Sequence, residues 1–336
     1  MTSATISNTL LAIQRNLNQD LLRKRIRRFQ IIRSWKRGLV KLPYPPEGIQ
    51  VDVTNACNLR CVFCRQSIAD DSRPKGFMKI ELLEKIAQDA SDKVFLFQFV
   101  VTGEPLLHKQ ITQMLRVAKA AGLKTNMHTN GTLLNEQMSE EIIRAGLDEL
   151  SFSFDTADKE QYEKLRRGAK FDDVVNKMRT FMAVKKRLKS KTPMIIMQNL
   201  RIFWEDPSAL EFEKGYKELL KSMGMPVKFF VKHYVNPAGK YNGSNFALGD
   251  PEKFFKPLGK TYTPCQQLWR RLSISWDGKV LGCCNDDGGE YLLGDLNTQS
   301  IMDVWNGERM IGFRQQHLKG EAKDLKLCKA CPSIWK

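Results

Sequence analysis

The chain has 336 residues, of which 42% are apolar, and it carries 54 lysines and arginines against 37 aspartates and glutamates. This composition excludes a disordered or collagen-like protein and leaves enough apolar residues for one large or two smaller domains. The chain lacks an apolar run of about 18 residues and the apolar core of a signal peptide. We therefore expect a cytoplasmic protein with a formal net charge of +17.

The first predicted element is a basic amphipathic helix. Residues 21–41 contain nine lysines or arginines and no acidic residue. Apolar residues recur among these bases every three or four positions from Leu22 to Trp35, and Gly38 and Pro43 end the pattern. Three interpretations stay open: a helix packed on the protein with its charged face in solvent, a surface for an anionic substrate or partner protein, and peripheral attachment to an anionic membrane.

The next part of the chain alternates between short β-rich runs and longer helical patterns. The predicted strands are residues 49–53, 94–101, 123–128, 149–154, 194–200 and 227–234. The predicted helices are residues 79–90, 111–121, 136–145, 171–188 and 208–223. Parallel strands need crossover connections of a dozen or more residues, so this α/β alternation predicts a parallel sheet covered by helices. Periodicity leaves open whether the sheet is flat or curled into a barrel.

A linker and a small C-terminal unit follow. Residues 236–263 are rich in glycine and proline and show little periodicity, which predicts a loop-rich linker. Residues 273–276 and 280–283 flank a turn and predict a hairpin, and residues 301–316 predict a helix. We therefore expect four units: a basic extension (1–47), an α/β domain (48–235), the linker (236–263) and a C-terminal α+β domain (264–336).

The eight cysteines fall into two clusters. Cys57, Cys61 and Cys64 follow directly on the first predicted strand, and five cysteines lie beyond residue 264. Clustered thiols in a reducing compartment indicate metal or redox chemistry. Three thiolates in eight residues can hold three corners of an iron-sulfur cluster and leave its fourth iron open. Structural zinc, which prefers four closed ligands, and buried free thiols are the alternatives.

This three-cysteine loop, with the aromatic Phe63 before its last cysteine, resembles the signature of the radical S-adenosylmethionine (SAM) enzymes. The resemblance implies a partial (β/α)6 TIM-type barrel and a four-iron cluster on Cys57, Cys61 and Cys64. It also implies that SAM chelates the open iron and is cleaved by one electron to methionine and a 5′-deoxyadenosyl radical, which abstracts a substrate hydrogen. Flavodoxin or ferredoxin is the kind of protein that donates this electron.

Further positions match segments that contact SAM in this family. Gly103 and Glu104 resemble part of its Gly-Gly-Glu-Pro motif, although Thr102 replaces the first glycine. Ser153 lies on the polar face of the fourth predicted strand, and Arg166 lies in a Leu-Arg-Arg-Gly segment. The resemblance implies that Glu104 meets the amino group of SAM, Ser153 its carboxylate or ribose, and Arg166 its carboxylate. A solvated charge at a helix end is the alternative for Arg166.

On spacing alone, the second set of cysteines suits zinc and an iron-sulfur cluster equally. The surrounding residues 272–284 and 301–307 resemble the SPASM or shortened twitch extension of radical SAM enzymes. This resemblance implies an auxiliary four-iron cluster with the ligands Cys265, Cys283, Cys328 and Cys331. Cys284 is then spare, because neighbouring residues of a strand point to opposite faces. It is either a hydrogen-atom donor or a buried free thiol.

An auxiliary cluster near the radical site provides a route for oxidation, since it can take a second electron after hydrogen abstraction. The C-terminal cysteine spacing resembles that of single-auxiliary-cluster aminocyclitol dehydrogenases, which implies dehydrogenation of a sugar or aminocyclitol-like alcohol. Epimerisation of a sugar, and epimerisation or crosslinking of a ribosomal peptide, are the alternatives. A non-catalytic iron-sulfur protein that binds nucleic acid is disfavoured, because a binder has no use for an open three-cysteine cluster beside Gly103 and Glu104.

Overall fold

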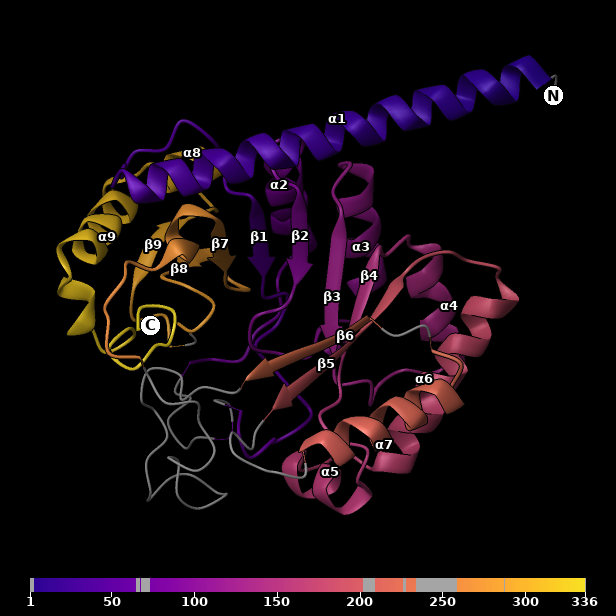
Figure 1. Cartoon of the computed structure of the whole chain (residues 1–336). Helices are drawn as coiled ribbons and strands as arrows, with labels where there is room; N and C mark the ends of the chain where they lie inside the picture. Colours follow the sequence, from indigo (N-terminus) through magenta and orange to yellow (C-terminus); the bar gives the residue numbers. More distant parts are fainter. Residues whose placement is uncertain are drawn as a thin grey trace.

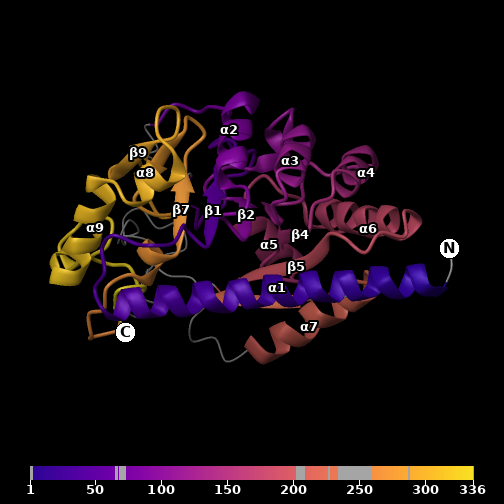
Figure 2. The same cartoon turned by 90° about the horizontal axis from the view of Figure 1, so that it is seen from above.

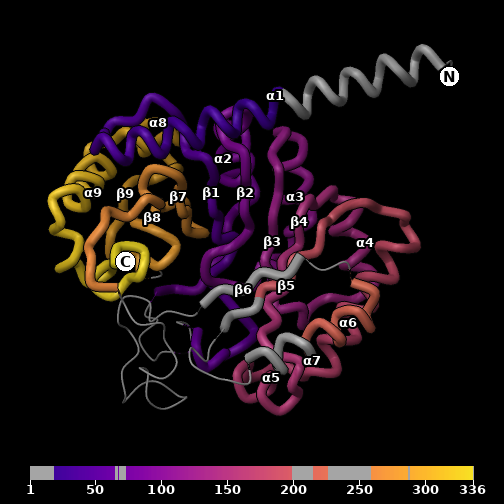
Figure 3. The backbone as a smooth tube through the Cα atoms, in the orientation of Figure 1, coloured from indigo at the N-terminus to yellow at the C-terminus, as the bar shows by residue number. Residues whose placement is uncertain are grey.

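The structure, a computed structural model, describes residues 3–64, 67, 73–201, 209–225, 228–233, 259–286 and 288–335. Figure 3 traces the backbone from the N-terminal helix to the C-terminus. Most of the predicted linker, residues 236–258, lies outside the described ranges.

A parallel sheet forms the centre of the molecule. Its strands are β1 (Gly48–Val51), β2 (Leu96–Phe99), β3 (Thr125–Thr129), β4 (Glu149–Ser153), β5 (Met194–Arg201) and β6 (Lys228–His233). Each strand pairs with the next one along the chain, as Ile49 does with Phe97 across β1 and β2. These six strands lie where alternation predicted them, and the predicted partial barrel is confirmed (Figure 1).

Helices connect these strands and cover the sheet. They are α2 (Ile80–Ala90), α3 (Ile111–Ala120), α4 (Glu136–Arg144), α5 (Lys159–Leu165), α6 (Phe171–Arg187) and α7 (Ala209–Ser222). Apolar side chains of these helices, such as Leu83, Met114 and Met178, are fully buried. The sequence did not predict α5, because seven residues are too few for a helical period; Asp158 begins this helix by accepting a hydrogen bond from the Gln161 amide at 2.6 Å.

The C-terminal domain continues the same sheet. The strand β7 (Arg271–Ile274) pairs parallel to β1, and β8 (Lys279–Leu281) and β9 (Leu292–Asp295) follow antiparallel. The resulting order is β6-β5-β4-β3-β2-β1-β7-β8-β9. The predicted hairpin is therefore confirmed as β7 and β8. The sequence did not predict that it would join β1, since nothing local to either strand specifies this partner.

The single predicted helix over residues 301–316 is wrong, because the structure contains two helices there. They are α8 (Ile301–Trp305) and α9 (Glu308–Lys319). Gly307 separates them in an extended conformation that a helix cannot continue. A Cβ atom at this position would lie 2.7 Å from the Asp303 carbonyl oxygen, so the break requires glycine.

The helix α1 (Ser3–Lys36) crosses the end of the sheet at which β1 and β2 begin (Figures 1 and 2). Arg27 donates to the carbonyl of Pro45 at 2.6 Å, just before β1, and Arg23 to that of Asp92 at 2.9 Å, just before β2. The Trp35 indole donates to the carbonyl of Pro264 at 3.1 Å, so α1 is also attached to the C-terminal domain. In the described part of the chain, every helix is too short or too polar to span a bilayer.

Candidate functional site

The three-cysteine loop lies at the carboxyl end of β1, where parallel sheets place their ligand-binding loops. Cys61 is buried and Cys57 and Cys64 are half-buried, all as free thiols. Each thiol lies within electrostatic reach of the other two. Burial raises the pKa of Cys57 and raises that of Cys61 to about 12, so the site favours thiolates only when a cation is bound.

The donor set indicates which kind of metal group fits. Among the described residues, no three His, Cys, Asp or Glu side chains converge on one point as the ligands of a single ion would. In an iron-sulfur cluster each cysteine binds a different iron, so its sulfurs do not have to converge. The loop offers three thiols, one fewer than the four closed ligands of structural zinc, and three thiols suit a four-iron cluster with one open iron.

Two neighbouring segments hold this loop in place. The amides of Arg60 and Val62 each donate at 2.9 Å to carbonyls at the C-terminal end of α5, those of Arg167 and Leu165 respectively. On the other side, the Asn130 amide group donates to Asn58 at 3.1 Å and lies 3.9 Å from the Cys57 sulfur. The turn that contains Asn130 therefore supports the cysteine loop.

Gly103 packs directly against the start of the cysteine loop. A Cβ atom on it would lie 1.9 Å from the Thr54 carbonyl oxygen, so only glycine fits. The Asp52 carboxylate accepts hydrogen bonds from the Gly103 amide at 3.3 Å and from both the amide and the hydroxyl of Thr102. This contact accommodates threonine where the family has glycine. Sequence reasoning missed Asp52, for which the one signal was an acid inside an apolar strand pattern.

Glu104 is a buried carboxylate, only 3% exposed. It accepts hydrogen bonds from the Thr129 hydroxyl and the Asn130 amide, both at 2.8 Å, and from the Leu106 amide at 3.2 Å. Within the described ranges it forms no ion pair. Burial outweighs these hydrogen bonds and raises its pKa to about 7. The amino group of SAM is a cation or strong donor of the kind that such a carboxylate requires.

Burial also raises the pKa of Asp52, to about 6. Both carboxyl groups therefore hold a proton more tightly in the folded chain than in the unfolded one, where such groups titrate near pH 4. Their ionisation therefore disfavours folding progressively as the pH rises from about 4 to about 7. A cationic ligand bound beside Glu104 offsets this penalty.

Arg166 is buried and paired, so the alternative of a solvated helix-end charge is wrong. Its Nε and Nη2 atoms lie 2.7 and 2.6 Å from Oδ2 of Asp155, with the side chains 5% and 2% exposed. Nη1 lies 3.9 Å from the Cys61 sulfur, and the guanidinium lies 5.4 Å from the Phe63 ring centre. Burial acts to lower the pKa of Arg166, but the nearby Asp155 and Cys61 outweigh it and raise the pKa above its ordinary value.

The fourth strand has the two-sided character that the sequence predicted. Phe152 and Phe154 are buried, while the hydroxyl of Ser151 accepts a hydrogen bond from Asn126 at 3.3 Å on the other face. Ser153 is half-buried on this polar face. Its contact with SAM stays a prediction.

The C-terminal cysteines come together from three separate segments. Cys265 precedes the 3-10 helix η5 (Gln266–Trp269), Cys283 follows β8, and Cys328 and Cys331 lie in the final turns. Cys265 and Cys331 lie within electrostatic reach of each other. Each of them also lies within electrostatic reach of the other two predicted ligands, Cys283 and Cys328. Burial raises the pKa of Cys265 and of Cys328 to about 12, and that of Cys283 well above its usual range.

Cys283 and Cys284 lie beyond the end of β8, so the alternation of strand faces does not make Cys284 the spare cysteine. The strand β8 ends at Leu281, and both cysteines lie in the turn that follows it. They are not consecutive strand residues on opposite faces. Cys283 and Cys284 each interact electrostatically with Cys265. The choice of Cys283 as the ligand therefore rests on the family resemblance alone and stays a prediction.

His317 on α9 lies against this second cysteine set, and the sequence analysis missed it. It is 1% exposed, its Nδ1 accepts the Cys265 amide at 3.4 Å, and its Nε2 lies 3.7 Å from the Cys328 sulfur. Burial lowers its pKa to about 4, so the ring is neutral at pH 7. Because Nδ1 accepts, Nε2 carries the hydrogen and points it at the sulfur.

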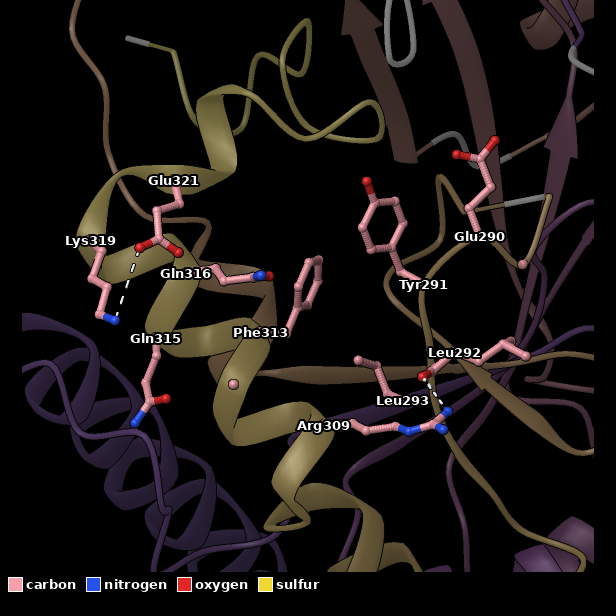
Figure 4. A pocket seen from close by; sticks show the side chains of 12 residues that line it. Glu290, Tyr291, Leu292, Leu293, Arg309, Phe313, Gln315, Gln316, Lys319 and Glu321 are labelled. Atoms are coloured by element: carbon pink, nitrogen blue, oxygen red, sulfur yellow. Dashed lines mark hydrogen bonds and ion pairs between the residues drawn. The ribbon is translucent and has the colours of Figure 1, made fainter.

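A surface pocket of about 700 Å³ lies between β9 and α9 (Figure 4). Tyr291, Leu293 and Phe313 form its apolar part and Arg309 lies at one side, where it donates to the Leu292 carbonyl at 3.2 Å. No cysteine lines this pocket. Its wall is nevertheless close to the C-terminal set of thiols, because Tyr291 lies within electrostatic reach of Cys328.

Comparison with protein families agrees with these two cysteine sites. The Radical SAM superfamily profile matches residues 51–206, and the profile of the SPASM iron-sulfur cluster-binding domain matches residues 265–332. The chain carries a radical SAM domain and a SPASM domain. As a radical SAM protein with a SPASM domain, it uses SAM and two iron-sulfur clusters as cofactors.

Curated relatives of this radical SAM protein have several different activities. It is 29% identical to GTP 3′,8-cyclase of Chlorobaculum tepidum over 58% of this chain, and it spans only 58% of that enzyme. It is 24% identical to a tungsten-containing aldehyde ferredoxin oxidoreductase cofactor-modifying protein of Pyrococcus furiosus, covering 85% of this chain and 89% of that one. It is 25% identical to PqqA peptide cyclase of Xanthomonas euvesicatoria, covering 86% and 80%.

Solved structures of similar fold were determined with different bound molecules. Streptococcus suis SuiB bound to its precursor peptide SuiA has a TM-score of 0.62 at 16% identity and covers 84% of this chain and 69% of that one. BtrN in complex with AdoMet and 2-DOIA has a TM-score of 0.52 at 17% identity, covering 84% and 91%. At these identities the likeness extends to the fold alone.

Proposed function

We propose that this protein cleaves SAM reductively and uses the resulting 5′-deoxyadenosyl radical to abstract a hydrogen atom from its substrate. The observation that carries the proposal is the position of the three-cysteine loop beside Glu104, a buried carboxylate without an ion-pair partner in the described part of the chain. Cys57, Cys61 and Cys64 would hold the SAM-binding cluster. When bound, this cluster supplies the electron that cleaves SAM.

The chain's own residues position SAM and protect the site. Glu104 accepts hydrogen bonds from the amino group of SAM, and Asp52 holds the Gly103 backbone close to the cysteine loop. Arg166 stabilises the Cys61 thiolate through its charge, and the ring of Phe63 covers the guanidinium. Ser153, half-buried on the polar face of β4, would meet the carboxylate or ribose of SAM.

The most direct test is anaerobic reconstitution followed by incubation with SAM and dithionite. We expect wild type to form 5′-deoxyadenosine and to bind about eight irons per chain, as two four-iron clusters require. The Cys57→Ala/Cys61→Ala/Cys64→Ala variant is expected to bind about four irons and to form no 5′-deoxyadenosine. A Cys284→Ala variant, whose cysteine lies outside the three-cysteine loop, serves as the control for 5′-deoxyadenosine formation alone. Equal 5′-deoxyadenosine formation by the triple variant and wild type contradicts the proposal.

We further propose that the enzyme is an oxidoreductase whose auxiliary cluster, held by Cys265, Cys283, Cys328 and Cys331, takes the second electron. Flavodoxin or ferredoxin supplies the first electron. Removal of a hydrogen atom from the carbinol carbon of a sugar or aminocyclitol-like alcohol, of the hydroxyl proton and of one further electron yields a ketone, and the cluster would supply an acceptor for that electron. The presence of only five C-terminal cysteines supports a single auxiliary cluster.

A ribosomal peptide is the second candidate substrate. It is favoured by the similarity to PqqA peptide cyclase, which spans most of both chains. Alcohol dehydrogenation and peptide crosslinking both remove two hydrogens, so each suits an electron-accepting cluster, whereas epimerisation does not need one. Mass spectrometry of candidate substrates after turnover distinguishes them, because oxidation lowers the substrate mass by two hydrogens and epimerisation leaves it unchanged.

His317 provides a separate test of the auxiliary cluster. Its Nε2–H group points at the Cys328 sulfur, and hydrogen bonds to cluster sulfurs stabilise the more negative, reduced form. We expect His317→Leu to lower the reduction potential of the auxiliary cluster, and His317→Gln, which keeps a donor, to lower it less. Redox titration followed by electron paramagnetic resonance measures this potential. An unchanged potential in His317→Leu contradicts the assignment of Cys328 as a ligand hydrogen-bonded to His317.

A further inference from the structure

We propose that the outward face of α1 docks on an anionic lipid bilayer. This outward face is defined by the exposed apolar residues Leu21, Leu22, Ile26, Phe29 and Ile32 and by the exposed basic residues Arg25, Arg28, Arg33 and Lys36. Docking through this face does not depend on the cluster chemistry proposed above.

Exposed large apolar side chains are concentrated on this face, compared with the rest of the described part of the molecule. Six of its nine exposed large apolar side chains lie between residues 21 and 39. Phe29 is 64% exposed and Leu22 is 57% exposed. Scattered exposed apolar residues are normal on a protein surface, but this concentration on one helix face indicates a binding surface.

Helical geometry explains why these residues face outward together. The opposite side of α1 is occupied by its contacts with the protein, with Ile31 and Ser34 buried and Arg27 bonded to the Pro45 carbonyl. At 3.6 residues per turn, Leu22, Phe29 and Arg25 lie on the half of the helix away from these contacts. Figures 1 and 2 show α1 running along the outside of the molecule, so this half faces outward.

The charges on the face identify the kind of surface that it fits. Residues 21–41 contain no acidic side chain, so the face is positive throughout. Lysine and arginine side chains reach the lipid headgroups while neighbouring phenylalanine, leucine and isoleucine enter the acyl boundary. The phosphates of a nucleic acid would attract the lysines and arginines, but they would not bury the exposed apolar side chains of Phe29 and Leu22. A bilayer with anionic headgroups satisfies both kinds of side chain.

The position of α1 also predicts how the docked enzyme is oriented. Its inner face contacts Pro45 and Asp92, which precede β1 and β2, whereas the cysteine loop follows the other end of β1. A bilayer on the outward face therefore leaves the cysteine loop facing the water. We expect vesicles to bind the protein without reducing its rate of SAM cleavage.

Flotation with the full-length reconstituted protein tests this proposal. The probes are vesicles of phosphatidylcholine mixed with phosphatidylglycerol, and vesicles of phosphatidylcholine alone. Wild type is expected to float with the anionic vesicles at low salt, to bind less at high salt, and to bind phosphatidylcholine weakly. Failure of wild type to float with anionic vesicles at low salt overturns the proposal.

Three matched variants separate the two kinds of contact. The apolar variant is Leu22→Gln/Ile26→Gln/Phe29→Gln, and the charge variant is Arg25→Gln/Arg28→Gln/Arg33→Gln. The control variant removes three exposed bases of α6 and η6 (Glu321–Lys323), as Arg179→Gln/Lys186→Gln/Lys323→Gln. We expect the charge variant to bind on the order of 100-fold more weakly, since each base near the surface contributes about fivefold.

The apolar variant decides between a bilayer and a general polyanion surface. It keeps every charge, so we expect it to lose flotation although its binding to a DNA duplex is unchanged. Wild-type flotation by the apolar variant overturns the bilayer assignment and leaves an electrostatic surface. Unchanged SAM cleavage and iron content in all three variants show that the substitutions have not unfolded the protein.

Discussion

Replacing Arg166 by methionine is expected to destabilise the protein by about 3–5 kcal/mol, because it leaves a buried charge without its partner. Asp155 is 2% exposed and lies 2.6 Å from Nη2 of Arg166. The lost guanidinium therefore cannot be replaced by bulk water. Denaturant unfolding of the reconstituted protein, followed anaerobically by circular dichroism, measures the change in the unfolding midpoint.

A second variant separates the ion pair from general packing at this position. In Arg166→Met/Asp155→Leu both charges are removed, and we expect this double variant to be more stable than Arg166→Met alone. The Arg166→Lys variant keeps the charge without the planar fork and is expected to fall between wild type and Arg166→Met. A double variant that is no more stable than Arg166→Met shows that the side-chain volume, and not the charge, matters at residue 166.

The substitution Gly103→Ala is expected to reduce SAM cleavage by at least about 100-fold, as a displacement on the order of 1 Å at a reacting site does. The added Cβ would lie 1.9 Å from the Thr54 carbonyl oxygen and 2.7 Å from that of Ala56. Both atoms belong to backbone, and the Ala56 carbonyl already accepts the Glu104 amide at 2.8 Å. The segment that carries Glu104 must therefore move away from the cysteine loop.

The rate of 5′-deoxyadenosine formation measures this effect, with iron content as the second readout. Gly215→Ala is the matched control, because an added Cβ there meets no atom within 4 Å. The auxiliary cluster is expected to be retained in both variants, so Gly103→Ala still binds about four irons or more. Wild-type 5′-deoxyadenosine formation by Gly103→Ala contradicts the close packing of this loop against the SAM site.

Local patterns in the sequence predicted the strands and most helices of the barrel. The period of two in β4, with Phe152 and Phe154 on one face, depends only on neighbouring residues, and so does the helical period of α2 and α6. The break between α8 and α9 was missed, because an apolar period continues across Gly307 and the crowding against Asp303 exists only in the folded chain. The joining of β7 to β1 was missed because strand partners are not encoded locally.

Some residues of the candidate site were likewise predicted from local sequence, and others were found only in the structure. Cys57, Cys61 and Cys64 were identified from spacing, since all three lie in one loop whose chemistry is carried by a short motif. Asp52 and His317 were missed because each acts through a residue distant in sequence, Thr102 and Cys328 respectively. Arg166 was placed in the right segment, but only the structure shows that Asp155 pairs with it.

By itself the sequence determined the number and spacing of the thiols and the concentration of positive charge in residues 21–41, since both are properties of the covalent chain. Tertiary structure decided which groups meet. It brought Cys265, Cys283, Cys328 and Cys331 together from three segments, and it placed both Cys283 and Cys284 in a turn near Cys265. It also buried one side of α1 and left Phe29 exposed with the bases on the other. Packing alone settles such contacts, because burial depends on partners that no local pattern specifies.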